Sequence, residues 1–259
     1  MKIIYKCLLS IRPASLGAWL SGVLGMNARR IVSVADAKFW VNPVSNFGYR
    51  ISDDSNYEPD TRRAIESNLK PNDVFIDLGA NEGYFSVVAS RVIGSSGRII
   101  AIEPQTRLQE VIRRNCELNN ISNVTLIQSV VGSFDGTVEL ELTPDVNTGA
   151  SGLYRQTKYR LPTQLVPCIT LNSLFKEHTI TKCDLMKVDI EGAEYDLVMQ
   201  AGGLLSSGVI KGIVMEVHDS IITARHLQVK DLYMRMESYG YSCEKQGELA
   251  IFTISMNRG

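Results

Sequence analysis

Acidic residues gather at two places in the chain, each directly after a short apolar run. Residues 77–83 form a glycine-containing stretch between the apolar run 74–76 and helix-spaced apolar residues. Residues 187–194 follow a second apolar run and include Asp189 and Glu191. Each pattern predicts a strand, a loop and a helix. Ligands of α/β sheets bind beyond the carboxyl ends of the strands, so we expect both stretches to line a binding site.

The glycine loop indicates which ligand this site could take. A dinucleotide fingerprint requires G-x-G-x-x-G, but Asn81 stands between Gly79 and Gly83 at the place of its second glycine. Glu82, at the mouth of the next helix, would repel a pyrophosphate. A ligand with an ammonium, a sulfonium and a carboxylate fits better, because Asp77 or Glu82 can meet its cations while loop amides bind its carboxylate. S-adenosylmethionine is such a ligand.

A further acid stands where a nucleoside would place its ribose. Glu103 follows the strand predicted at residues 98–102, and Pro104 disfavours helical backbone at Glu103. A carboxylate at this strand end can accept hydrogen bonds from both ribose hydroxyls. Ser129 and Val130 follow the next predicted strand and would lie beside the adenine, although a plain connecting turn fits their spacing equally well.

Catalytic groups are predicted at the ends of two later strands. Side chains two apart on a strand share a face, which pairs Lys187 with Asp189 and Glu216 with His218. If the two strands are neighbours, these groups face the transferable methyl group. Either His218 or Asp189 could then take the proton from an attacking hydroxyl. Histidine has the ordinary pKa nearest to neutral pH, but a histidine at a strand end is also common in protein cores.

The same acids could instead bind a divalent metal. Asp189, Glu191, Glu216 and His218 offer ligand atoms that suit Mg²⁺ or Mn²⁺. The chain has no short ligand-spaced motif such as H-E-x-x-H. We therefore expect no metal, and our catalytic candidates are Asp189, His218, Glu191 and Lys187.

The order of the predicted elements gives the fold class. Strands and helices alternate from residue 74 to residue 217, as in a parallel sheet. Residues 137–142 and 165–169 add a hairpin in the middle, in which Pro167 suggests an edge strand. Residues 241–245 and 249–254 form a terminal hairpin. The prediction is an α/β chain with a seven-stranded, mostly parallel sheet, an antiparallel terminal hairpin and an inserted β-hairpin.

The amino-acid composition indicates which classes of substrate and which cell compartment to expect. The 259 residues carry a net charge of -1, which does not favour nucleic acid and points to small substrates. The five cysteines are odd in number and dispersed, which predicts reduced thiols in a cytoplasmic protein. The polar stretch at residues 145–164 has no periodicity, so we expect it to shape the acceptor pocket, with disorder as the alternative.

The first 36 residues form a separate segment before the domain predicted at residues 37–259. Residues 18–24 are too short an apolar run to span a bilayer, so no transmembrane helix is predicted. Apolar residues at helical spacing predict a helical extension that packs on the domain or covers it as a lid. Because basic residues flank these apolar residues, peripheral contact of residues 1–30 with an anionic membrane is the alternative.

The motifs together resemble the FkbM family of S-adenosylmethionine-dependent methyltransferases. The resemblance spans residues 37–254 and rests on the stretches 57–59, 77–84, 102–104, 130–132, 170–174 and 187–194. It implies a class I methyltransferase Rossmann-like fold and O-methylation of a sugar, glycan or natural-product hydroxyl. It implies cofactor contacts in the glycine loop, including Ala80, at Glu103 and, through the first stretch, at Glu58. Asn172 stands where the family usually has aspartate.

Three functions stay open at this point. The first is an S-adenosylmethionine-dependent O-methyltransferase. The second is a non-catalytic protein that binds the cofactor for structure or sensing. The third is a NAD-dependent oxidoreductase, which Asn81 and Glu82 disfavour.

Overall fold

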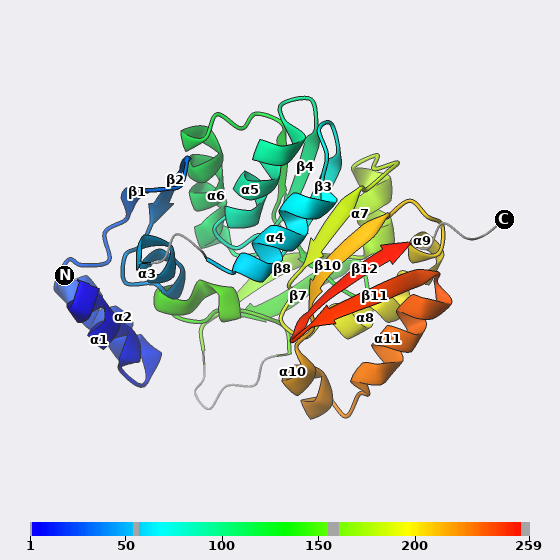
Figure 1. The fold of residues 1–259 in the computed structure, drawn as a ribbon. Coiled ribbons are helices and arrows are strands. Elements are labelled where there is room, and N and C mark those ends of the chain that lie inside the picture. Colours follow the sequence, from blue (N-terminus) through cyan, green and yellow to red (C-terminus); the bar gives the residue numbers. More distant parts are fainter. Residues whose placement is uncertain (1, 54–56, 155–160, 255–259) are drawn as a thin grey trace.

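The computed structural model describes residues 2–53, 57–154 and 161–254, and a seven-stranded sheet lies at its centre (Figure 1). Its strands are β3 (Val74–Leu78), β4 (Arg98–Ile102), β5 (Val124–Ile127), β9 (Leu185–Val188), β10 (Gly212–Glu216), β11 (Tyr241–Gln246) and β12 (Leu249–Ile254). They lie in the order β11-β12-β10-β9-β3-β4-β5. The strands from β10 to β5 are parallel, and β12 is antiparallel to β10 and β11. This arrangement confirms the predicted class I methyltransferase Rossmann-like fold.

Helices cover both faces of the sheet because successive strand residues point in opposite directions. Phe75 and Ile99 pack with α4 (Pro59–Asn68) and α5 (Tyr84–Ile93), and Ala101 packs with α6 (Thr106–Leu118). Ile76 and Ile100 pack on the other face. The helices of that face are α7 (Leu171–Glu177), α8 (Glu194–Gln200) and α11 (Val229–Ser238). The short helices α9 (Gly202–Leu205) and α10 (Asp219–Ala224) follow α8 and β10.

A second sheet contains the inserted hairpin. β7 (Gly136–Glu141) and β8 (Thr163–Ile169) are antiparallel, and β6 (Val130–Val131) pairs with the other side of β8. The edge position suggested by Pro167 is therefore wrong, since β8 is the central strand. The proline is tolerated because β6 is short and pairs only with Cys168 and Ile169. The 3₁₀ helix η1 (Asp145–Ala150) lies between β7 and β8 in the sequence.

The N-terminal segment is helical only in its first part. It contains α1 (Lys2–Ser10) and α2 (Ala14–Val23), then a hairpin of β1 (Arg30–Val34) and β2 (Ala37–Val41) that precedes α3 (Asn46–Asp53). The expected helical extension to residue 36 is thus wrong at residues 30–34, where β-branched residues form a strand that pairs with β2. Among the helices of the described residues, none has the length and apolar character needed to cross a membrane.

Candidate active site

The two loops predicted to bind a ligand meet at the carboxyl edge of the central sheet. The amides of Gly79 and Ala80 donate to the Ile102 carbonyl at 3.0 and 2.9 Å, and the Asp189 amide donates to the Leu78 carbonyl at 3.1 Å. Gly79 has a φ of +79°, and a Cβ at this position would lie 1.9 Å from the Asp189 carbonyl oxygen. A glycine is therefore required for the two loops to approach so closely.

A cavity of about 600 Å³, including space open to solvent, lies outside these loops and is called the donor cavity below. Its size is within the range of small-molecule sites. It is lined by the glycine loop, the end of β4, the region of β6, residues 149–153 and the loop after β9. Five predicted cofactor residues line it: Gly79, Asn81, Glu103, Ser129 and Val130.

Glu103 lies in the wall of the donor cavity and is only 3% exposed. Its Oε2 accepts from the Asn81 amide and its Oε1 from the Gln105 amide, both at 2.9 Å. Burial raises the pKa of Glu103 to about 7, although these hydrogen bonds oppose the rise. Each carboxylate oxygen can accept more than one hydrogen bond, so both still have capacity for a ribose hydroxyl. The lining therefore fits S-adenosylmethionine, the predicted cofactor.

Two predicted cofactor residues lie beneath the loop and do not line the donor cavity. Asp77 is fully buried, and its Oδ2 accepts from the Ser86 hydroxyl at 2.7 Å. Gly83 precedes α5 with a φ of +79°, and a Cβ there would lie 3.2 Å from the Ile112 side chain. In the structure, both residues support the loop from below, because Asp77 contacts α5 and β9 and Gly83 approaches α6.

Lys187, a predicted catalytic residue, is a buried cation between the two loops. Its Nζ donates to the Gly79 carbonyl at 2.9 Å and lies 3.3 Å from Asp189 Oδ2 and 3.6 Å from Asp77 Oδ1. Burial would lower the pKa of Lys187, but the charges of Asp189, Asp77 and Glu58 outweigh this effect and raise it. Lys187 is therefore protonated at neutral pH, and it holds Gly79 and Asp189 in place.

Glu82 does not offer its carboxylate to a ligand, contrary to the sequence prediction. Its side chain is fully buried and accepts a hydrogen bond of 2.7 Å from Arg29 Nη1. The Glu82 carbonyl accepts from Asn115 Nδ2 at 2.7 Å. Burial raises the pKa of Glu82 more strongly than the nearby Arg29 lowers it. The ion pair attaches the N-terminal segment to the glycine loop.

A second cavity of about 970 Å³, its open part included, adjoins the donor cavity and is called the acceptor cavity. The residues that line both cavities are Asn81, Gly149, Asp189 and Glu191. Three of the four predicted catalytic residues, Asp189, Glu191 and His218, come together in the acceptor cavity, and Glu216 lies beside them. Glu58, a predicted cofactor contact, lines this cavity and not the donor cavity. Ala80 lines a smaller pocket beside Glu58 and Lys187.

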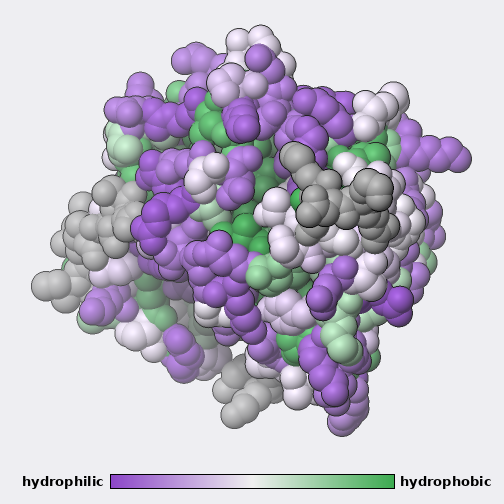
Figure 2. Space-filling view, turned by 45° about the vertical axis from the view of Figure 1, so that its right-hand side comes forward, coloured by the Kyte–Doolittle hydropathy of each residue, from purple (hydrophilic) through white to green (hydrophobic). Residues whose placement is uncertain are grey.

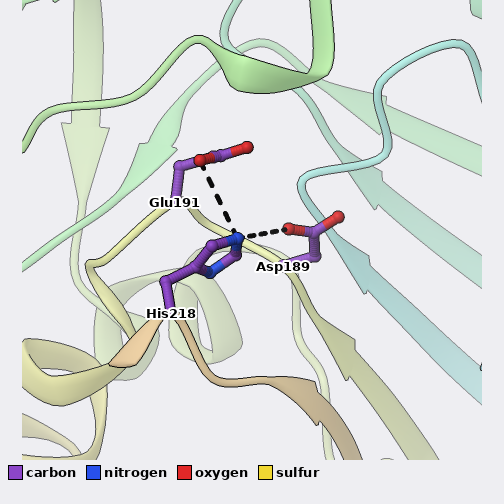
Figure 3. A group of neighbouring side chains, drawn as sticks. All are labelled: Asp189, Glu191 and His218. Atoms are coloured by element: carbon purple, nitrogen blue, oxygen red, sulfur yellow. Dashed lines mark ion pairs between the residues drawn. The ribbon is translucent and has the colours of Figure 1, made fainter. Parts of the chain in front are cut away.

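His218 is held between acids on both sides of its ring. Its Nε2 lies 3.9 Å from Asp189 Oδ1 and 3.8 Å from Glu191 Oε2 (Figure 3). Its Nδ1 lies 3.0 Å from Oε1 of the fully buried Glu194, which also accepts two backbone amides of its own loop. Burial would lower the pKa of His218, but the hydrogen bond to Glu194 and the three acids raise it to about 9.

The group at His218 also has the composition of a metal site. Ligand atoms of Asp189, Glu191 and His218 all lie within 4.8 Å of one another. A metal would need the neutral imidazole as its ligand, whereas the surrounding acids favour a proton on His218 at neutral pH. A metal-free site remains our prediction.

Three residues around the acceptor cavity have left-handed backbone although none is glycine. They are Glu58 with φ 44°, Asn81 with φ 49° and Glu191 with φ 50°. Such backbone costs about 1–3 kcal/mol per residue and is often found at functional sites. Only Asn81 is a residue type that tolerates this conformation well, so the left-handed backbone of Glu58 and Glu191 could not be predicted from residue type.

The stretch at residues 145–154 lies at the junction of the two cavities, where Gly149 lines both. In η1, the Thr148 hydroxyl donates to Asn81 Oδ1 at 2.9 Å, and the Thr148 carbonyl accepts from Gln105 Nε2 at 3.1 Å. Residues 155–160 of this predicted loop lie outside the described part of the chain.

Arg50, which the sequence analysis missed, lines the acceptor cavity. Its guanidinium lies 4.8 Å from the centre of the Tyr57 ring.

A family model described as the methyltransferase FkbM domain matches residues 77–243, more than half of the chain. The chain belongs to this family. The match begins at the glycine loop and includes Glu103, Asp189 and His218, so it covers most of both cavities of this FkbM methyltransferase. The family predicted from the sequence motifs is therefore confirmed, and with it the methyltransferase function.

Two relatives carry names that state the same activity. This FkbM methyltransferase is 29% identical over 171 residues to "Methyltransferase 1" of Beauveria bassiana (strain ARSEF 2860), covering 58% of the chain and 67% of the relative. It is 28% identical over 161 residues to "Methyltransferase sdnD" of Sordaria araneosa, covering 51% of the chain and 61% of the relative.

Solved methyltransferase structures resemble this FkbM methyltransferase only distantly. M. jannaschii TYW2 in complex with AdoMet has a TM-score of 0.44 and 13% identity, covering 88% of this chain and 85% of TYW2. Precorrin-6y C5,15-methyltransferase from Geobacter metallireducens GS-15 has a TM-score of 0.44 and 16% identity, covering 76% and 88%. Likenesses at this level assign no substrate.

Proposed function

We propose that this FkbM methyltransferase transfers the methyl group of S-adenosylmethionine to a hydroxyl of a small molecule, such as a sugar, a glycan or a natural product. The observation that carries the proposal is the shared wall of the two cavities. Asp189 and Glu191 line both, and His218 lies on the acceptor side. A hydroxyl in the acceptor cavity would thus meet acid–base groups where the donor cavity opens.

The donor cavity would hold the cofactor by polar contacts at both ends of its nucleoside. Glu103 would accept hydrogen bonds from the ribose hydroxyls, and Ser129 and Val130 would lie beside the adenine. Bound S-adenosylmethionine supplies an electrophilic methyl group attached to a sulfonium. Asp189 and Glu191 at the cavity junction attract this positively charged end.

We assign His218 as the base that takes the acceptor proton. Glu194 forms a hydrogen bond with Nδ1 of His218, so that Nε2 is directed toward the acceptor cavity. A carboxylate on one ring nitrogen orients an imidazole base in this way. The acids that face Nε2 keep His218 protonated, and a cation bound beside them would offset their charge and lower the pKa of His218. Proton removal by a positioned base contributes about 10²- to 10⁴-fold.

The lining of the acceptor cavity supports a small acceptor that carries no phosphate. Four acids line it, Glu58, Asp189, Glu191 and Glu216, against the two cations Arg50 and His218, and this excess of acids would disfavour nucleic-acid phosphates. We therefore keep the prediction that nucleic acid is not the substrate.

All five cysteines are free thiols. Free thiols persist in the reducing environment of the cytoplasm, so they support the predicted cytoplasmic location.

The test is release of S-adenosylhomocysteine in the presence of a panel of glycosides, polyketides and small phenols. We expect turnover with at least one hydroxyl compound and transfer of the methyl group to its oxygen, as determined by NMR of the product. Binding of S-adenosylhomocysteine without turnover of any compound would favour a non-catalytic cofactor-binding protein. Binding of NADH instead would favour an oxidoreductase.

A further inference from the structure

The two N-terminal helices present several large apolar side chains to solvent. Trp19, Val23 and Leu24 are 62%, 65% and 59% exposed, and Leu16 on the same helix and Ile4 on α1 are 45% and 50% exposed. We call these five residues the apolar patch. In Figure 1, α1 and α2 lie at one end of the molecule. The face shown in Figure 2, by contrast, is mostly hydrophilic, with hydrophobic side chains in small separate areas.

The small residues of α2 determine which of its faces is buried. Gly17 and Ser21 are the buried residues of this helix. A Cβ on Gly17 would lie 2.4 Å from the Leu8 carbonyl oxygen of α1, so α2 approaches α1 with its smallest residues. Tyr5 and Leu8 of α1 are buried with Val44. Because the small face of α2 is turned inward, its bulky apolar face is left outward.

The charged residues of the N-terminal segment itself have one sign. None of the 28 acidic residues of the chain occurs before Asp36, whereas five of the 27 basic residues do. Lys6, Arg12 and Arg30 are exposed. A segment that combines an exposed tryptophan, exposed aliphatic residues and exposed basic residues has the composition of one that lies in the interface of an anionic bilayer. A symmetric contact between two copies of this segment would instead bring like charges together.

We propose that α1 and α2 bind the surface of an anionic phospholipid membrane. The apolar patch enters the headgroup region, and Lys6, Arg12 and Arg30 contact lipid phosphates. α2 lies against η1, which contributes lining to the acceptor cavity. Membrane binding through α2 therefore brings the acceptor cavity close to the bilayer surface.

The test is co-sedimentation of the full chain with vesicles of phosphatidylcholine alone or with added phosphatidylglycerol. We expect binding only to the anionic vesicles, with weaker binding at high salt. The double variant Trp19→Ser/Val23→Ser should bind about tenfold or more weakly. Lys6→Gln should reduce binding about fivefold. Phe134→Ser/Leu165→Ser is the matched control, because these apolar residues are 51% and 73% exposed on other elements, and it should bind like the parent.

Three results would overturn the proposal. The first is equal sedimentation with neutral and anionic vesicles, or none with either. The second is an equal loss of binding in the control variant. The third is a dimer in light scattering that Trp19→Ser/Val23→Ser converts to a monomer without any vesicle binding by the parent, which would make the patch a contact between two copies. Both double variants replace exposed side chains, and their circular dichroism must match that of the parent.

Discussion

Glu194 and His218 form a carboxylate–imidazole pair that joins the loops after β9 and β10. Glu194 Oε1 lies 3.0 Å from His218 Nδ1, and the Glu194 side chain is fully buried. Because the same carboxylate accepts the amides of Ile190 and Gly192, it has a fixed position. The pair therefore determines where Nε2 points, and several predictions depend on it.

Replacement of His218 should lower the turnover number without changing the affinity for S-adenosylhomocysteine. We expect His218→Ala to bind S-adenosylhomocysteine with unchanged affinity in calorimetry, because His218 does not line the donor cavity. Its kcat should fall about 10²- to 10⁴-fold through loss of the base. His226→Ala, at an exposed histidine, is the control and should keep full activity. Undiminished turnover of His218→Ala would remove this residue from the mechanism.

The activity should rise with pH through the pKa of His218. That pKa is raised to about 9 without the cofactor and would be lowered by the cation of the bound cofactor, so the neutral base becomes more abundant as the pH increases from neutral toward 9. Glu194→Gln removes the charge that stabilises the imidazolium, so the rise in kcat/KM should move to lower pH. The maximum should also fall, because the new amide can donate to Nδ1 and leave the proton on Nε2. A profile with an unchanged midpoint would assign Glu194 a purely structural role.

Donor binding should depend on the ionisation of Glu103. Burial raises its pKa to about 7, so the carboxylate becomes protonated as the pH falls through this value. The protonated group loses acceptor capacity, and the Kd of S-adenosylhomocysteine should rise about tenfold between about pH 8 and about pH 6. Glu103→Gln should bind weakly at both pH values and without this dependence. If the parent and Glu103→Gln showed equal affinity, the ribose contact would be refuted.

Loss of Arg29 should destabilise the fold. Arg29→Ala leaves the fully buried carboxylate of Glu82 without its partner, and unpairing a buried charge costs about 3–5 kcal/mol. Urea unfolding measures this loss, and Glu82→Gln in the same background should recover most of it. The control is Arg91→Ala, whose partner Asp36 is 91% exposed, because such surface pairs contribute little. Equal losses for Arg29→Ala and Arg91→Ala would contradict this account.

Chelation should leave turnover unchanged. A divalent ion at Asp189 and Glu191 would compete with the proton on His218, which the neighbouring acids stabilise. We expect the same kcat after dialysis against EDTA and after addition of Mg²⁺ or Mn²⁺. If the activity disappeared on dialysis and returned with either metal, Asp189, Glu191 and His218 would be identified as a metal site.

The sequence by itself was sufficient to predict features that depend only on residues close together in the chain. The apolar run before Gly79 and the proline after Glu103 each specify a strand end, and parallel strands place such ends at one edge of a sheet. The pairing of Lys187 with Asp189 also followed from strand geometry alone. These features led to the predicted cofactor and to several of the residues now found around the two cavities.

Only the tertiary structure decided the contacts between distant segments. Glu82 forms an ion pair with Arg29 of the N-terminal segment. Thr148 of η1 donates a hydrogen bond to Asn81 at the cavity junction. The small face of α2 turned Trp19 outward. Sequence periodicity records which residues share a face of one element, whereas the partner of that face depends on how all the elements pack together.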